Sequence, residues 1–130
     1  EIDELLTAPL AKLLARHEDL DADALLAAAV AAVGPEVATM THSSREGLLE
    51  ISAAGVSKAT TLAALCAEHG RDASAAVAFG DMPNDLPMLA WASHGVAVAN
   101  AHADVLAAAD EVTATNDEDG VALVLERWFG

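Results

Sequence analysis

The sequence predicts an α/β protein in which a parallel sheet covered by helices follows a smaller α+β layer. From Gly55 onward, helical segments alternate with short, almost wholly apolar strands, which is the pattern of a parallel sheet buried on both faces. Residues 37–52 instead contain two strand-like segments around a turn, which indicates an antiparallel hairpin. We therefore expect two domains, at 1–53 and 54–130.

The first domain is expected to hold this hairpin, one further strand and one helix. The helix begins at acidic residues that cap helices well, and Gly34-Pro35 ends it. β-branched and hydroxyl side chains favour the first hairpin strand, and Arg45-Glu46-Gly47 forms the turn after it. In chain order we expect a strand at 10–17, a helix from Asp21 or Asp23 to Val33, and strands at 37–44 and 48–52.

The second domain is expected to alternate helices and strands up to its end. Ser57 is a good N-cap for the first helix, Gly70 ends that helix, and Gly95 ends the next one. We expect helices at 58–69, 86–93, 103–109 and 118–129, and strands at 75–79, 96–99 and 111–115.

Composition and charge restrict the partners of the chain. Apolar residues make up 54% of it but aromatic residues only 3%, so we expect a core of small and aliphatic side chains rather than disorder. A formal net charge of −15 repels nucleic acid and anionic lipid surfaces, and we expect neither as a partner. The same charge would repel a phosphorylated ligand, which would need a metal ion and a nearby cation in order to bind.

Cysteine and histidine usage argues against a disulfide framework or a zinc site. Cys66 is the single cysteine, and it shares a helical face with Leu62 and Leu65, which predicts a buried hydrophobic side chain. The N-terminus has no signal-peptide pattern and the apolar stretches are too short to cross a membrane, so we expect a cytoplasmic protein. The histidines lack metal-ligand spacing, and we interpret them as surface or helix-end residues: His17, His42, His69, His94 and His102.

The segment from Ala76 to Asp85 is the clearest candidate for chemistry. An apolar strand ends at Gly80, and Asp81, Asn84 and Asp85 follow within five residues. Ligands of open α/β sheets bind beyond the carboxyl ends of the strands, and two carboxylates suit Mg²⁺ better than a soft metal. The alternative is a turn with helix-capping side chains, which explains Asn84 or Asp85 but not Asp81 at the strand end.

Lys58 is the second candidate. It lies in the first turn of a helix that Ser57 caps, where the helix dipole disfavours a cation. We therefore expect an anion nearby, and a bound phosphate shared between the ammonium group and the backbone N–H groups would fit. The alternative is an ordinary solvated surface lysine.

Two polar segments follow later strands. Asn100 comes directly after the strand at 96–99, where it could help to shape a ligand crevice. The acidic run from Asn116 to Asp119 precedes the last helix, and helix capping is nearly sufficient to explain it.

On these residues, the second part of the chain resembles the haloacid dehalogenase superfamily of phosphatases, in its Cof-type (IIB) branch. The resemblance covers about residues 48–130 and depends on several motifs that occur in order. They are Leu49-Glu50-Ile51, Gly55-Val56-Ser57-Lys58-Ala59 with Leu62 and Leu65, Gly80-Asp81-Met82-Pro83-Asn84-Asp85 with Met88-Leu89, Ala99-Asn100-Ala101, and Asn116-Asp117-Glu118-Asp119-Gly120-Val121.

The resemblance implies a role for each residue of the candidate site. Lys58 resembles the lysine that contacts both the nucleophilic aspartate and the substrate phosphate. Asp81 resembles the Mg²⁺ ligand, and Asn84 resembles the residue that contacts the phosphate. Asp85 resembles the second acid of the metal loop, which acts on the metal through water or on Lys58. Gly80 allows the backbone to approach closely.

The resemblance also implies segments that we do not find near the start of the chain. The family carries its nucleophile and general acid in an Asp-x-Asp-Gly segment on the first core strand, and a phosphate-binding Ser or Thr on the next. Asp19-Leu20-Asp21-Ala22 has the spacing but lacks the glycine and a preceding apolar strand, so we interpret it as a loop and helix cap. We therefore expect the C-terminal part of a haloacid dehalogenase-like Rossmannoid core at 54–130, preceded at 1–53 by part of the family's substrate-selecting cap.

Three functional hypotheses follow. The first is the metal- and phosphate-binding part of a Mg²⁺-dependent phosphatase that acts on small phosphorylated metabolites, such as sugar phosphates, through an aspartyl phosphate. The second is a non-catalytic module that binds a ligand or a partner chain carrying the absent first strands, and an exposed sheet edge would favour such pairing or self-association. The third is a metal-binding domain of unrelated function.

Overall fold

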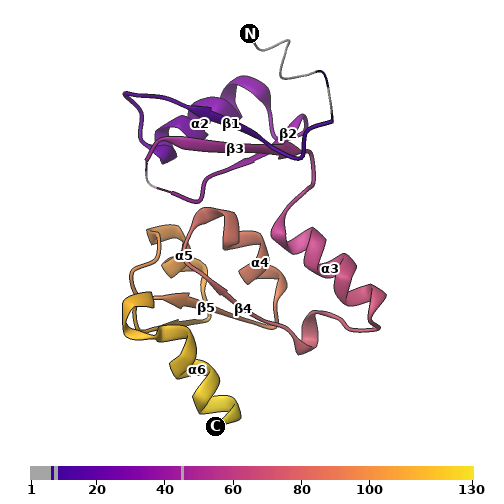
Figure 1. Ribbon diagram of the computed structural model, residues 1–130, viewed down its shortest axis with the longest axis vertical. Coiled ribbons are helices and arrows are strands. Elements are labelled where there is room, and N and C mark those ends of the chain that lie inside the picture. The colour runs from indigo at the N-terminus through magenta and orange to yellow at the C-terminus, as the bar shows by residue number, and fades with distance from the viewer. Residues whose placement is uncertain (1–6, 8, 45) are drawn as a thin grey trace. The chain divides into compact units, whose positions relative to one another are not determined.

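The protein folds into two compact units, which we describe one at a time (Figure 1). The structure is a computed structural model that describes residues 7, 9–44 and 46–130. The first unit ends at Val56 and the second begins at Ser57, whereas the sequence places the boundary after residue 53. The difference has a physical reason, because Gly55 N–H donates to Thr39 Oγ1 over 2.9 Å and Val56 N–H donates to the Ala53 carbonyl over 3.1 Å.

The first unit is a three-stranded antiparallel sheet with a helix packed on its second and third strands. Its strand order is β1-β3-β2, and β2 pairs antiparallel with β3, which confirms the predicted hairpin. The Asp21 side chain caps the helix by accepting the Ala24 N–H over 2.8 Å, and Leu49 of the central strand is fully buried. The elements are β1 (Leu13–Arg16), α2 (Ala22–Val33), β2 (Ala38–Thr41) and β3 (Leu48–Ala53).

One histidine of this unit is buried, which the sequence interpretation missed. His42 is only 1% exposed, so its placement among the surface and helix-end histidines was wrong. Its Nε2 lies 2.8 Å from Asp23 Oδ1 in the first turn of α2, and its Nδ1 lies 3.0 Å from the Ser44 carbonyl. Buried polar groups need such partners. The ring therefore ties the start of the helix to the chain that leaves β2.

The second unit contains a three-stranded parallel sheet, as the sequence predicts. Its strand order is β4-β5-β6, and each neighbouring pair is parallel. The strands are β4 (Val77–Gly80), β5 (His94–Val98) and β6 (Glu111–Thr113). The α-helices are α3 (Lys58–Glu68), α4 (Leu86–Trp91), α5 (Ala103–Ala108) and α6 (Gly120–Phe129), with single 3₁₀ turns at Ala73–Ala75, Pro83–Asp85 and Asn116–Glu118.

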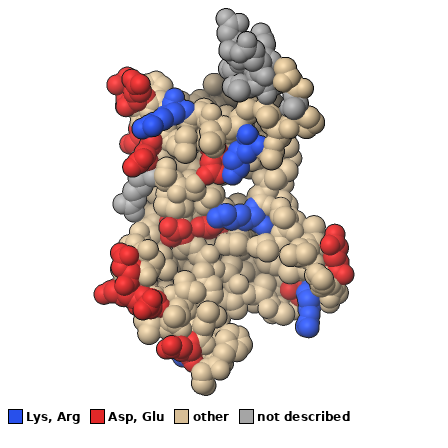
Figure 2. Space-filling view, in the orientation of Figure 1, with Lys and Arg blue, Asp and Glu red and all other residues tan. Residues whose placement is uncertain are grey.

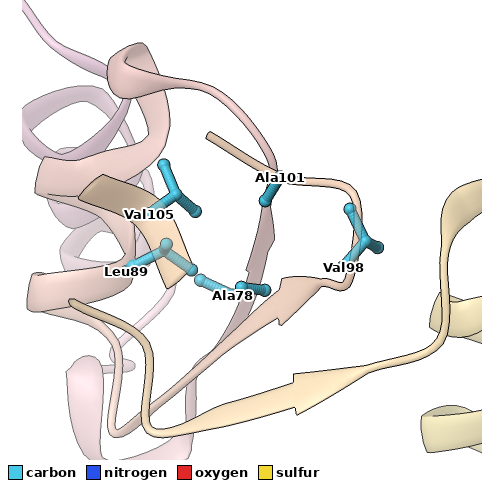
Figure 3. Packing of buried hydrophobic residues seen from close by; sticks show 6 residues of the cluster. Ala78, Leu89, Val98, Ala101 and Val105 are labelled. Carbon is cyan, nitrogen blue, oxygen red and sulfur yellow. The ribbon is translucent and has the colours of Figure 1, made fainter. Parts of the chain in front are cut away.

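Small and aliphatic side chains form the core of this unit (Figure 3). Ala78 of β4 and Val98 at the end of β5 pack with Leu89 of α4, with Ala101 in the turn before α5, and with Val105 of α5. Alanines within the strands let the helices lie close to the sheet. The composition, rich in alanine and poor in aromatics, is therefore used directly in the packing.

The predicted burial of Cys66 is not what the structure shows. Helix α3 fully buries only Ala59, Leu65 is 49% exposed, and Cys66 is half-buried. Because α3 packs against α4 rather than lying on the sheet, its apolar side chains are only partly covered.

Charge is dispersed over the part of the surface in view. On the face that Figure 2 shows, acidic side chains lie scattered rather than gathered in one patch. The formal charge of −15 therefore acts there as a general field rather than as a local docking surface. Within the described residues, we find no helix with both the length and the hydropathy needed to cross a bilayer.

A polar network fastens the C-terminal helix to the sheet. Arg127 Nη2 donates to Glu111 Oε1 over 2.6 Å, and His94 Nε2 lies 3.1 Å from Glu111 Oε2. The Arg127 guanidinium and the His94 ring both contact Trp128, at 5.7 Å and 5.5 Å between centres. The hydrogen bond from Arg127, and then that from His94, hold the pKa of Glu111 below its usual range.

This pKa shift predicts an acid-sensitive contact. A carboxyl group whose pKa is lower in the folded state stabilises the fold above its ordinary pKa, and that contribution is lost as the pH falls toward the lowered value. We expect Glu111→Gln to lower the midpoint of denaturant unfolding at pH 7, and the difference from the parent to shrink below about pH 4. Glu126→Gln on α6, the helix that carries Arg127, is the matched control. An equal loss in both variants at every pH would contradict the assignment.

Candidate active site

The candidate site lies at the carboxyl end of the parallel sheet, beside the last residue of β4. Gly80 is buried at the strand end and Asp81, directly after it, is exposed. A single 3₁₀ turn at Pro83–Asp85 then leads into α4, and it brings Asp85 back beneath the residues at the strand end. The strand-turn-helix unit predicted from the sequence is therefore confirmed.

Asp85 is the anchor of this segment. It is only 4% exposed, and its Oδ2 accepts the backbone N–H groups of Asp81 over 3.1 Å and of Met82 over 3.2 Å. Its Oδ1 accepts a hydrogen bond from the Lys58 ammonium group in an ion pair. These three donors compensate a carboxylate that is removed from water.

Lys58 comes to this place from the start of α3. Ser57 caps the helix in a reciprocal pair with Thr60: Ser57 Oγ accepts the Thr60 N–H over 3.1 Å, and Thr60 Oγ1 accepts the Ser57 N–H over 2.9 Å. The anion that the sequence predicts beside Lys58 is present as Asp85. The lysine side chain is still 48% exposed, so its ammonium group also faces outward and can meet a second anion.

Two oxygen-bearing groups of the site have no protein partner that would use them. Among the residues that the structure describes, Asn84 Oδ1 is a buried side-chain oxygen without a hydrogen bond. The structure assigns no hydrogen bond or ion pair to the exposed Asp81 carboxylate. A buried oxygen without a donor is costly unless a ligand satisfies it, and hard oxygens of this kind suit Mg²⁺. The donor set therefore fits the metal ion that the sequence predicts.

Gly80 is required by the approach of Asp85. A Cβ atom at this position would lie 2.6 Å from the Asp85 Cβ, closer than two carbon atoms can pack. The close approach expected of Gly80 is thus made to the anchoring side chain of the same segment.

The loops after β5 and β6 meet at the same edge of the sheet. Asn100 is exposed, and its amide is paired with Asn116 from the loop after β6. The backbone N–H of His102 donates to the Asp81 carbonyl over 2.7 Å. Sequence reasoning assigned Asn116 to a capping run and missed this pairing; the signal was its place after the next parallel strand.

Asp117-Glu118-Asp119-Gly120 also has the Asp-x-Asp-Gly spacing, and this match went unnoticed in the sequence. The structure places it beyond β6, in a 3₁₀ turn and the start of α6. Asp119 has the positive φ of 58°, and a Cβ on Gly120 would lie 2.1 Å from the Ala114 carbonyl oxygen. The spacing is explained by this tight turn, so it does not mark a nucleophile on a strand.

Comparison with known proteins identifies the family. Residues 1–125 match the family model described as haloacid dehalogenase-like hydrolase. The chain belongs to this family. Its α/β fold, with a parallel sheet at the site, is the fold of the solved family members that it resembles.

Among the similar proteins are phosphatases and hydrolases that are longer than this chain. The 5-amino-6-(5-phospho-D-ribitylamino)uracil phosphatase YitU of Bacillus subtilis (strain 168) is 42% identical over 82 residues, which are 63% of this chain and 30% of that protein. The HAD subclass IIB sugar phosphatase BT4131 superposes with a TM-score of 0.66 at 32% identity, over 71% of this chain and 35% of that one. A haloacid dehalogenase-like hydrolase from B. subtilis superposes with a TM-score of 0.81 at 32% identity, over 95% of this chain and 44% of that one. The chain thus spans about a third to under a half of these relatives.

The contact between Gly80 and Asp85 yields a test of the site's packing. We expect Gly80→Ala to cost about 1–3 kcal/mol in the free energy of unfolding, because the added methyl group displaces Asp85. Denaturant unfolding measures the loss, and the NMR signals of the Asp81 and Met82 amides should shift because they lose their acceptor. Unchanged stability together with unchanged amide signals would contradict the packing described.

Proposed function

We propose that the chain holds the metal and phosphate side of a Mg²⁺-dependent phosphatase that acts on small phosphorylated metabolites such as sugar phosphates. The observation that carries the proposal is the buried Asp85, which joins the Lys58 ammonium group to the backbone of Asp81. The Asp85 carboxylate is used by these contacts within the protein. The Asp81 carboxylate and Asn84 Oδ1 therefore stay available to a ligand.

The proposed roles follow from these contacts. Asp81 would bind Mg²⁺, with Asp85 contributing through water or through Lys58, and Asn84 and Lys58 would bind the substrate phosphate. Bound Mg²⁺ would neutralise charge on the phosphate oxygens. Asp85 orients Lys58, whose exposed ammonium group offsets the general negative charge of the protein where the phosphate would lie. The phosphoryl group would be transferred to an aspartate outside this chain and then released by water.

The relatives support the reaction and the class of substrate. YitU is named as a phosphatase of a ribityl phosphate compound, and BT4131 as a sugar phosphatase. We extend this substrate class, the Cof-type branch and a cytoplasmic location to this chain as part of the proposal. In the same proposal, residues 1–53 form part of a cap that selects the substrate.

Ligand binding to the purified chain tests the proposal. We expect Mg²⁺ titration to shift the amide signals of residues 80–85, and inorganic phosphate to bind only when Mg²⁺ is present. Asp81→Asn should abolish Mg²⁺ binding, and both Asp81→Asn and Lys58→Met should weaken phosphate binding at least about tenfold, since each removes a charge-assisted contact. Asp117→Asn removes an exposed acid from the loop after β6 and serves as the control.

The variants also separate the proposal from an unrelated metal-binding domain. That reading expects Asp81→Asn to abolish Mg²⁺ binding while Lys58→Met leaves all ligand binding intact. A chain that binds Mg²⁺ but no phosphate would favour it and would contradict the phosphatase proposal.

A second candidate function is a non-catalytic module that pairs with another polypeptide. It is favoured by the position of β4 at the edge of its sheet, with Val77 40% exposed. We expect such a module to elute as a larger species in size-exclusion chromatography when it is mixed with a polypeptide that contains the N-terminal half of the family fold. A monomer that this polypeptide leaves unchanged would count against the second candidate.

A further inference from the structure

The amide side chains of Asn100 and Asn116 form a pair with one possible orientation. The backbone N–H of Asn116 donates to Asn100 Oδ1 over 3.2 Å. A backbone N–H can only donate, so it fixes the direction of the Asn100 amide group. The Asn100 Nδ2 then donates to Asn116 Oδ1. The pair therefore requires a donor and an acceptor at Asn100 but only an acceptor in the side chain of Asn116.

This pair lies at one end of a short, well-fastened turn. Ala99 N–H donates to the Ala114 carbonyl over 3.3 Å, and Ala101 N–H donates to the Val98 carbonyl over 3.0 Å. Ala101 itself is 6% exposed and belongs to the core of the unit. The turn therefore leaves the backbone little conformational freedom between Asn100 and His102, the residue that contacts Asp81.

His102 connects the turn to the candidate metal ligand. Its backbone N–H donates to the Asp81 carbonyl over 2.7 Å, while the N–H on the other side of the same peptide group, that of Met82, donates to Asp85 Oδ2. The peptide group between Asp81 and Met82 is thus held from both sides. The direction in which Asp81 presents its carboxylate depends on that peptide group, because no described residue forms a hydrogen bond or ion pair with the Asp81 side chain.

We propose that Asn100 and Asn116 are positioning residues, which hold Asp81 in the direction needed for Mg²⁺ through the His102 N–H. The inference deepens the proposed function and rests on it, since it takes Asp81 as the metal ligand. Asn100 acts here through its contact with Asn116, which engages one donor and one acceptor of its side chain.

The different needs of the two amides allow a sharp test. Asn116→Asp keeps the side-chain oxygen that accepts from Asn100, whereas Asn100→Ala and Asn116→Ala each remove the pair. Asn116→Asp also adds one negative charge, and the alanine variants add none. A general electrostatic effect on Mg²⁺ would therefore strengthen binding in Asn116→Asp and leave the alanine variants unchanged, while loss of the pair weakens binding in the alanine variants alone.

Mg²⁺ titration of the whole chain, followed by the amide signals of residues 80–85, is the measurement. We expect Asn100→Ala and Asn116→Ala to weaken Mg²⁺ binding about threefold to tenfold, the range for the loss of one or two hydrogen bonds, and Asn116→Asp to stay within about twofold of the parent. Hydrogen exchange of the His102 amide should become faster in the first two variants only, at unchanged melting temperature of the core.

The outcomes separate the inference from the proposed function. If the parent chain binds no Mg²⁺, the proposed function fails and the inference falls with it. If the parent binds Mg²⁺ and all three variants bind equally well, only the inference is overturned. Equal weakening in Asn116→Asp and Asn100→Ala would likewise overturn it, because the pairing geometry would then not matter.

Discussion

The ion pair between the buried Asp85 and the half-exposed Lys58 is the interaction on which the site depends. A carboxylate that is 4% exposed would be strongly unfavourable without compensation, and here three donors compensate it. Two of the donors are the backbone groups of the neighbouring turn. The electrostatics that make Asp85 tolerable in the interior therefore also fix the shape of the segment that carries Asp81.

The fold was predictable because its signals are local and repeated. In the second unit, short apolar strands alternate with helices, which indicates a parallel sheet. In the first unit, a turn joins two β-rich segments, which indicates an antiparallel hairpin. Neither inference needs long-range information. The boundary between the units was less predictable. It depends on hydrogen bonds from Gly55 and Val56 to residues of the first unit, and no pattern in the sequence predicts such contacts.

The site was predictable in its members more than in its contacts. Charge and position identify Lys58 and Asp85 as candidates, and the helix dipole argument gives Lys58 an anionic neighbour, but only the fold shows that this neighbour is Asp85. Asn116 and His42 were misjudged for a shared reason. Each forms a hydrogen bond with a residue that is distant in the sequence, Asn116 with Asn100 and His42 with Asp23. The periodicity of the sequence contains no information on such distant pairs.

The length of the turn between Gly80 and Asp85 sets a limit on change in this segment. The anchoring Asp85 and the exposed Asp81 are four residues apart, and one 3₁₀ turn lies between them. Adding or deleting a residue there would rotate Asp85 away from the backbone N–H groups that it accepts. The longer connection between α3 and β4, which Ser93 contacts at Ala73 and Ala76, holds no residue of the candidate site. Tolerance to insertions should therefore differ sharply between two stretches that flank the same strand.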